Sequence, residues 1–310
     1  MAEADDDLVI PFEIKPLAVR GRLVRLGAAL DAIVQQHRYP DVVSAVLSEG
    51  VAITAMLGSL LKVEGQFILQ TSTNGPLDLL VSQYTSPAGL RAYARFDANA
   101  VEGKPPGSLL GTGHLAMTID QGANTERYQG IVAVGEGGLS EAALTYFRQS
   151  EQIPTWLKTS VGPLISRGDA TAHWRAGALM VQHLPAAGES HRAVQDLAGG
   201  DDAAEEPENE SWTRARLLAQ TVEDHELLDP SITPERLLYR IFHEDGVTVY
   251  PATRLVQRCN CSRDRVRGML KSFSQAEQSE MAEAGAIKVK CEFCSKEYEF
   301  SVSELDNPVQ

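Results

Sequence analysis

The sequence predicts an α+β protein with three parts: an N-terminal, mainly antiparallel sheet domain with packed helices, a helical linker region and a small C-terminal domain. Short strand-like segments separated by turn residues fill residues 66–134, which favours antiparallel hairpins. Residues 41–62 carry apolar side chains at helical spacing. All four cysteines lie after residue 258, which indicates one shared role for the C-terminal part. We place the domain boundaries at 1–195, 196–253 and 254–310.

The first elements are expected to be a strand and two helices. Residues 1–17 look like an acidic tail that leads into a strand at Val19–Leu26. Gly27–His37 begins a helical stretch. Asp41–Lys62 is predicted to be a helix that buries one face and is ended by Gly65.

An antiparallel sheet is expected next. Turn-forming residues at 74–76, 86–89 and 121–124 separate segments that read as strands. The expected elements are strands at 66–73, 77–84, 90–96, 114–120 and 126–134, a helix at 140–150 capped by Ser140, and strands at 155–161 and 176–184.

The linker region has three parts that differ in composition. Residues 196–210 are rich in acid and poor in apolar side chains, so we expect a solvated, disordered stretch. Ser211–Leu228 is predicted to be one helix capped by Ser211. Residues 229–254 are apolar but interrupted by proline and glycine, so we expect only a helix at Pro234–His243 and a short strand. Residues 229–254 cannot form a core of their own and must pack on another part of the protein.

Charge and composition exclude several classes of function. The formal net charge is −14 (28 basic against 42 acidic residues), which argues against broad binding to nucleic acid or to an anionic membrane. No run of 18 apolar residues is found, and the acidic N-terminus does not resemble a secretory signal. We therefore expect a cytoplasmic protein with reduced thiols. The glycines at 111–113 lack the rest of a phosphate-binding loop and no nucleophile motif stands out, so no enzyme is expected.

The cysteines form two close pairs, Cys259-Asn260-Cys261 and Cys291-Glu292-Phe293-Cys294, separated by 29 residues with two candidate helices, 264–273 and 275–284. Four thiolates in two pairs match the tetrahedral coordination that zinc prefers. A Cys-x-x-Cys turn can point both sulfurs at one ion, and residues i and i+2 of an extended segment share a face. We therefore predict that Cys259, Cys261, Cys291 and Cys294 bind one Zn²⁺ per chain. Basic residues near the pairs would stabilise such an anionic centre: Arg258, Arg263, Lys288, Lys290 and Lys296.

The spacing alone leaves more than one interpretation open. A structural zinc ribbon in a nucleic-acid-binding or adaptor protein has the same ligands. Secreted disulfides or a thioredoxin-like oxidoreductase fit less well, because nothing indicates secretion and the second pair would have no role. A disulfide between Cys259 and Cys261 would close a small, strained and easily reduced ring, which suits a reversible switch. A module of about 50 residues is too small to stay folded without its metal, so oxidation would unfold it.

Further motifs, together with the cysteine pattern, are typical of a known family. They are 70–77 (QTSTNGPL), 111–121 (GTGHLAMTIDQ), 127–132 (RYQGIV), 146–154 (YFRQSEQIP), 238–244 (LYRIFHE) and 258–265 (RCNCSRDR). Over most of its length the chain resembles the redox-regulated thirty-three-kilodalton heat-shock chaperones. The acidic insertion at 196–210 departs from that family's pattern.

The resemblance implies an ATP-independent holdase that is inactive while it is reduced and zinc-bound. Oxidants would form the disulfides Cys259–Cys261 and Cys291–Cys294, release zinc, and unfold the C-terminal domain and the linker. The active form would be a homodimer that binds unfolded or oxidatively damaged client proteins. The linker residues that would contribute to the client-binding surface are Leu237, Leu238, Tyr239, Ile241 and Phe242.

Overall fold

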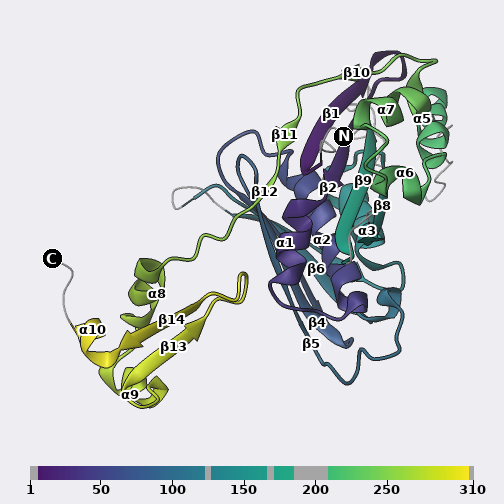
Figure 1. The fold of residues 1–310 in the computed structure, drawn as a ribbon. Coiled ribbons are helices and arrows are strands. Elements are labelled where there is room, and N and C mark those ends of the chain that lie inside the picture. The colour runs from purple at the N-terminus through teal and green to yellow at the C-terminus, as the bar shows by residue number, and fades with distance from the viewer. Residues whose placement is uncertain (1–5, 123–126, 166–170, 185–208, 307–310) are drawn as a thin grey trace, which may run out of the picture.

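The computed structural model describes residues 6–122, 127–165, 171–184 and 209–306. Two larger sheets with packed helices form a main body, and a small two-stranded sheet with short helices lies apart from it at the C-terminal end (Figure 1). The predicted α+β class, with antiparallel sheets in the N-terminal part, is confirmed.

The first large sheet, sheet A, combines strands from the start of the chain with strands that follow residue 154. Its strands lie in the order β10-β1-β2-β9-β8, and β11 also pairs with β1. Their bounds are Leu8–Ile14 (β1), Val19–Leu26 (β2), Thr155–Leu164 (β8), His173–His183 (β9), Thr248–Val249 (β10) and Thr253–Arg254 (β11). The strands predicted at 19–26, 155–161 and 176–184 are confirmed. β8 continues to Leu164, beyond its predicted end, and β9 begins at His173, before its predicted start.

The prediction of an acidic tail over residues 1–17 is wrong for residues 8–17. Leu8–Ile14 forms β1, which pairs with β2 along its whole length, and the short 3-10 helix η1 (Lys15–Leu17) leads to β2. Side chains of β1 enter the cores on both faces of the sheet, so the strand lacks the polar alternation that would have marked it. Residues 1–5 lie outside the described part of the chain.

The second large sheet, sheet B, has the order β12-β5-β4-β3-β6-β7. Its strands are Gln66–Thr73 (β3), Leu77–Thr85 (β4), Gly89–Phe96 (β5), Gly113–Asp120 (β6), Tyr128–Val134 (β7) and Val256–Gln257 (β12). Five of them are the predicted hairpin strands, with bounds that shift by one or two residues. The sixth, β12, comes from the far end of the chain and pairs in parallel with β5.

Helices α1 (Ala28–Gln35) and α2 (Asp41–Gly58) form the centre of the main body. The prediction that α2 buries one face is wrong, because it contacts strands of both sheets and is buried on nearly every side. It also ends at Gly58, well before Gly65. Its mean hydropathy of 1.5 over 18 residues would suit a membrane span, but 78% of that window is buried inside the protein. Packing between two sheets therefore explains its apolar composition.

A third helix, α3 (Gly138–Tyr146), continues into a π-helical turn, η3 (Phe147–Glu151). The predicted cap at Ser140 is wrong, because Gly137 precedes the helix and Ser140 lies inside it. The Ser140 hydroxyl instead donates to Glu49 Oε1 over 2.6 Å.

The linker segment, which we define as residues 209–254, forms three helices. They are α5 (Glu210–Gln220), α6 (Asp224–Leu228) and α7 (Pro234–Phe242). The single helix predicted over 211–228 is therefore wrong: Asn209 caps α5, and a capping box formed by Glu223 and Glu226 starts α6. The predicted helix at 234–243 is confirmed as α7, which Thr233 caps. Of the acidic insertion, residues 196–208 lie outside the described part.

The linker segment covers the face of sheet A that points away from α2. Phe12, Leu23 and Val181 from the sheet pack there with Trp212 and Phe242 from the linker helices. Strands β10 and β11 then extend the edge of sheet A beside β1, and β12 extends sheet B beside β5 (Figure 1). The expectation that residues 229–254 pack on another part of the protein is confirmed.

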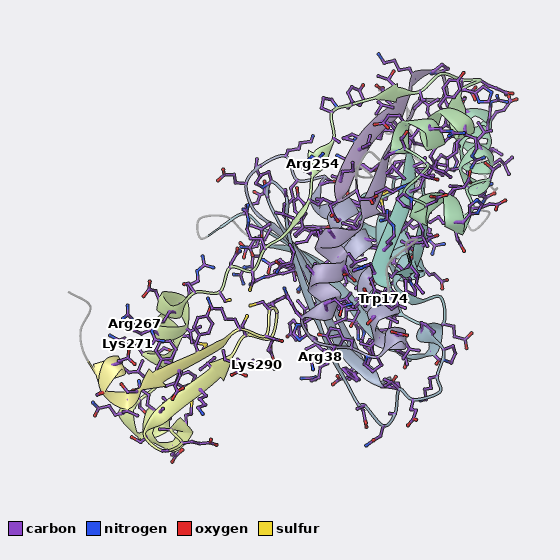
Figure 2. The ribbon with its side chains drawn as sticks, viewed as in Figure 1. Arg38, Trp174, Arg254, Arg267, Lys271 and Lys290 are labelled. Carbon is purple, nitrogen blue, oxygen red and sulfur yellow. The ribbon has the colours of Figure 1, made fainter. Side chains whose placement is uncertain are left out.

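The C-terminal module, defined here as residues 259–306, has a very small core. It contains α8 (Arg263–Leu270), α9 (Gln275–Met281), β13 (Ala286–Lys290), β14 (Glu297–Ser301) and α10 (Val302–Asp306). The buried hydrophobic side chains of its core are Leu270, Ile287, Tyr298, Phe300 and Leu305. Figure 2 shows Lys290 on the side of this module that faces the main body, and Arg267 and Lys271 on the outer side.

Candidate metal centre

The first cysteine pair lies on an extended segment between β12 and α8. The segment stays extended up to Ser262, which accepts a hydrogen bond from Arg265 N (3.2 Å) and so starts α8. Arg265 also donates to the carbonyl of Asn260 over 2.8 Å, which fixes the backbone between Cys259 and Cys261.

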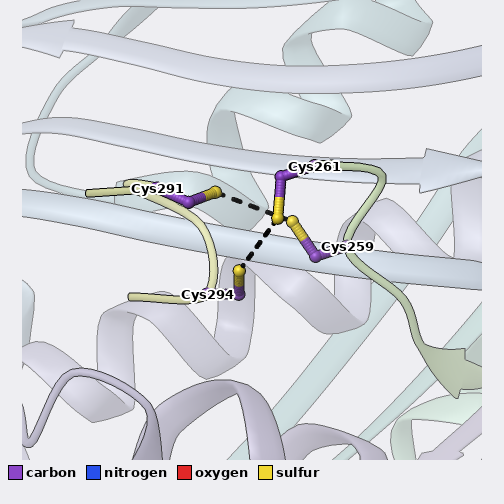
Figure 3. Close-up of side chains that lie close together, drawn as sticks. All are labelled: Cys259, Cys261, Cys291 and Cys294. Atoms are coloured by element: carbon purple, nitrogen blue, oxygen red, sulfur yellow. Dashed lines mark hydrogen bonds between the residues drawn. The ribbon is translucent and has the colours of Figure 1, made fainter. Parts of the chain in front are cut away.

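The second pair lies in the tight turn that joins β13 to β14. Cys291 N donates to Lys296 O over 2.9 Å, and Ser295 N donates to Cys291 O over 2.8 Å. Ser295 has a φ of 56°, a left-handed conformation that lets the chain reverse within a few residues. The turn therefore holds Cys291 and Cys294 on one side, facing the first pair (Figure 3).

All four sulfurs gather at one point, as the spacing predicted. Their ligand atoms lie within 4.8 Å of one another, with 3.7 Å between Cys259 Sγ and Cys291 Sγ and 3.3 Å between Cys261 Sγ and Cys294 Sγ (Figure 3). Zinc–sulfur bonds of about 2.3 Å in a tetrahedron require sulfurs about 3.8 Å apart. The donor set and its dimensions therefore fit a four-cysteine metal site.

The cysteines differ in how readily they ionise. Burial raises the pKa of the Cys261 thiol, but hydrogen bonds from the Tyr298 hydroxyl (3.2 Å) and the other cysteines outweigh burial and lower the pKa to about 7. The same bond raises the pKa of Tyr298 to about 12. Burial raises the pKa of both Cys259 and Cys294. One thiolate is thus favoured in the centre before any cation arrives.

Some of the predicted basic neighbours have other partners. The Arg263 guanidinium pairs with Glu304 at 2.9 Å and lies 4.4 Å from the centre of the Phe300 ring. The Lys296 ammonium lies 5.3 Å from the centre of the Tyr298 ring, whose hydroxyl donates to Cys261. Of these two, Arg263 therefore has its charge engaged by a carboxylate, whereas Lys296 contacts the aromatic ring that bonds to the centre.

The cysteine turn contacts the main body through Phe293. Its ring meets Tyr93 edge-on at 4.9 Å, and the Arg91 guanidinium lies 4.0 Å from the ring centre. His37 Nε2 donates to the Phe293 carbonyl (3.2 Å), and its Nδ1 accepts from the Ser295 hydroxyl (3.1 Å). Burial lowers the pKa of His37, which favours the neutral ring that this pattern needs. The sequence analysis did not identify these residues, although an aromatic residue inside a Cys-x-x-Cys turn was a usable signal.

The chain that enters the first cysteine pair is also held by the main body. Val256 N donates to Ala88 O over 3.0 Å, and Arg258 N donates to Leu90 O over 2.8 Å. Both halves of the cysteine centre therefore contact the β5 region of sheet B, one through backbone pairing and the other through Phe293.

Comparison with known proteins identifies the family. The model of the Hsp33 protein family matches residues 7–301. The chain belongs to the Hsp33 family of chaperones. The 33 kDa chaperonin of Caulobacter vibrioides is 39% identical, with 98% of this chain and 96% of that protein aligned. The 33 kDa chaperonin of Nitrosococcus oceani is 35% identical, with 95% and 91% aligned. A crystal structure of the 33 kDa chaperonin from Thermotoga maritima has the same fold, with a TM-score of 0.76, 22% identity and 97% of each chain covered.

Membership of the Hsp33 family supports a chaperone function for this chain, and the relatives carry names of chaperonins rather than of enzymes. The linker residues expected at a client-binding surface occupy two sides of α7. Leu237, Leu238, Ile241 and Phe242 are buried against sheet A, whereas Tyr239 lies on the opposite side of the helix and is 65% exposed. In this form of the Hsp33 chain, four of the five residues are therefore covered.

We expect Phe293→Ala to loosen the contact between the cysteine turn and the main body while leaving all four thiols in place. Loss of the edge-on aromatic contact and the cation–π contact removes about 1–2 kcal/mol. Hydrogen exchange of the Val256 and Arg258 amides should speed up about tenfold in the reduced protein. Phe273→Ala is the matched control, because this residue is 39% exposed in the same module. Equal exchange in both variants would show that Phe293 does not hold the turn.

Proposed function

We propose that this chain is a redox-regulated, ATP-independent holdase whose four cysteines bind one Zn²⁺ in the reduced, inactive form. The observation that carries the proposal is the gathering of all four sulfurs within 4.8 Å, in a module tied to the main body next to the linker. The fold and the family membership support the chaperone part of the proposal. The exclusive use of cysteine ligands supports zinc over harder cations.

In the reduced form, the cysteine centre joins the two halves of the C-terminal module. Zinc, when bound, supplies a cross-link between Cys259–Cys261 and Cys291–Cys294 that a core of five buried side chains cannot replace. Tyr298 orients Cys261, and the Lys296 backbone closes the turn of the second pair. The linker segment then stays folded on sheet A, and its apolar side chains are covered.

Oxidation breaks this cross-link. Formation of the disulfides Cys259–Cys261 and Cys291–Cys294 takes two electrons from each pair of thiolates. Hydrogen peroxide is a sufficient oxidant: one molecule accepts the two electrons and two protons for each disulfide and leaves as two waters. Disulfides within each pair leave no thiolate to bridge the halves of the module, so the C-terminal module loses its order.

The loss of order then spreads to the linker. Strands β11 and β12 directly precede Cys259 and hold the end of the linker on both sheets. When they detach, the chain that follows α7 is no longer held on the two sheets, and the linker segment then leaves sheet A and exposes its apolar side chains to unfolding or oxidatively damaged clients. The N-terminal domain remains folded. The active form is a homodimer. The setting is the cytoplasm, where the reduced state is the resting state.

A titration of zinc and free thiols, run beside an aggregation assay, tests the proposal. Peroxide at mildly raised temperature should release one zinc and remove four free thiols per chain. Suppression of the aggregation of an unfolding model protein should appear in parallel, without ATP. Salt-sensitive nucleic-acid binding that disappears with zinc would instead favour a zinc-ribbon nucleic-acid-binding protein. Suppression of equal strength in the reduced protein would contradict redox control.

A further inference from the structure

Two arginines of sheet A hold the backbone of α6 at its C-terminal end. Arg25 on β2 donates to the Asp229 carbonyl (2.6 Å) and to the Glu226 carbonyl (2.7 Å). Arg175 on β9 donates to the Leu228 carbonyl over 2.8 Å. Carbonyls at a helix C-terminus lack partners within the helix and carry partial negative charge, so guanidinium groups bind them well.

Arg25 is an unusual core residue. It is 1% exposed and is one of the largest fully buried side chains among the described residues. Its two side-chain hydrogen bonds both go to carbonyls of the linker segment, and among the described residues its Nε has no hydrogen-bond partner. A buried cation needs acceptors, because the cost of removing it from water is otherwise not offset. Departure of α6 would therefore leave Arg25 open to another acceptor.

Arg175 differs because it keeps a partner of its own. It forms an ion pair with Asp6 at 2.6 Å, which does not depend on the linker. The pair keeps its guanidinium in place beside Arg25 whether or not α6 is present. The two guanidinium groups on sheet A are therefore preorganised to bind backbone oxygens.

The sheet surface beneath α6 is shaped for close approach of a backbone. A Cβ atom at Gly177 would lie 2.5 Å from Leu227 O and 2.8 Å from Leu227 Cβ, so only glycine allows this contact. The Leu227 side chain is fully buried among the apolar residues of sheet A. The site thus binds backbone carbonyls and one apolar side chain, which are features that most polypeptides share.

We propose that Arg25, Arg175 and Gly177 form a backbone-recognition site for clients, which α6 fills while the chaperone is closed. After the linker leaves, the site binds a leucine-containing helical turn of an unfolding chain through its free carbonyls. This inference rests on the proposed holdase function and identifies one place where the client would bind. The same contacts that close the protein also explain recognition without a fixed client sequence.

The test uses the oxidised full-length protein and a labelled synthetic peptide of residues 221–232. Because the protein's own α6 would compete, the receiver carries Leu227→Asp, which expels that side chain from the sheet. The peptide should bind and should be displaced by an unfolded model protein. Arg25→Lys in the receiver should weaken peptide binding tenfold or more, because lysine cannot serve two carbonyls in a fixed geometry.

Arg22→Lys is the matched control, since Arg22 lies on the same strand but bonds to Ser59 on the other side. If Arg25→Lys does not fold, Arg175→Lys replaces it with the same expectation. Equal affinities of the Arg25 or Arg175 variant and the Arg22 variant would overturn the inference. So would a receiver that suppresses aggregation but does not bind the peptide, and that result would leave the holdase function standing.

Discussion

Cys294→Ser is expected to unfold the C-terminal module in the reduced protein. Four-cysteine sites in small modules contribute about 10–16 kcal/mol to folding through the bound metal, and loss of one ligand removes much of that free energy. The remaining core is Leu270, Ile287, Tyr298, Phe300 and Leu305, which is too small to hold about 50 residues together. Amide signals of β13 and β14 should collapse to unfolded positions in NMR spectra.

The same variant should suppress client aggregation without oxidant, because the strands that tie the linker to both sheets lead directly into this module. Asn260→Ala is the matched control: it changes the same loop but keeps all four thiols. A Cys294→Ser protein with an ordered C-terminal module and no gain in activity would contradict the role given to the centre.

Phe242→Asp is expected to release α7 from sheet A. Phe242 is fully buried, and its ring lies 5.7 Å from that of Phe12. Removal of a buried phenylalanine side chain costs about 3–5 kcal/mol, and a carboxylate in its place has no partner on this apolar face. We therefore expect the free energy of unfolding of the linker to fall by about 4 kcal/mol or more, with partial holdase activity in the reduced, zinc-loaded protein.

Limited proteolysis between residues 229 and 254 and the aggregation assay check this expectation. Tyr239→Asp is the matched control, because this residue lies on the same helix but is 65% exposed. The control should leave proteolysis unchanged, since its side chain faces solvent. A reduced Phe242→Asp protein that is silent and as stable as the wild type would show that α7 does not gate activity.

Local patterns were sufficient where short-range chemistry decides the structure. The strand at Val19–Leu26 and the helix that starts at Pro234 were predicted nearly to the residue, because the apolar run and the proline that mark them act over a few positions. The break between α5 and α6 was missed, although Glu223 and Glu226 form a capping box. That box lies inside a segment whose apolar residues recur at helical spacing throughout, so the spacing predicted one continuous helix.

Long-range packing explains the other errors. The apolar run of β1 followed acidic residues and resembled the end of a tail, and only its pairing with β2 makes it a strand. The apolar surface of α2 extends all the way round because two sheets enclose it. Neither the pairing of β1 with β2 nor the enclosure of α2 by two sheets can be inferred from the residues of β1 or α2 alone.

The sequence by itself determined that the four cysteines act as one cluster, that the linker is largely helical and that the fold is α+β, because close spacing of the thiols and periodicity act locally. Only the tertiary structure decided that Phe293 docks on β5 and that Arg25 binds carbonyls that lie 201 and 204 positions further along the chain. Such contacts depend on which surfaces the folded chain brings together, and no local pattern of residues specifies them.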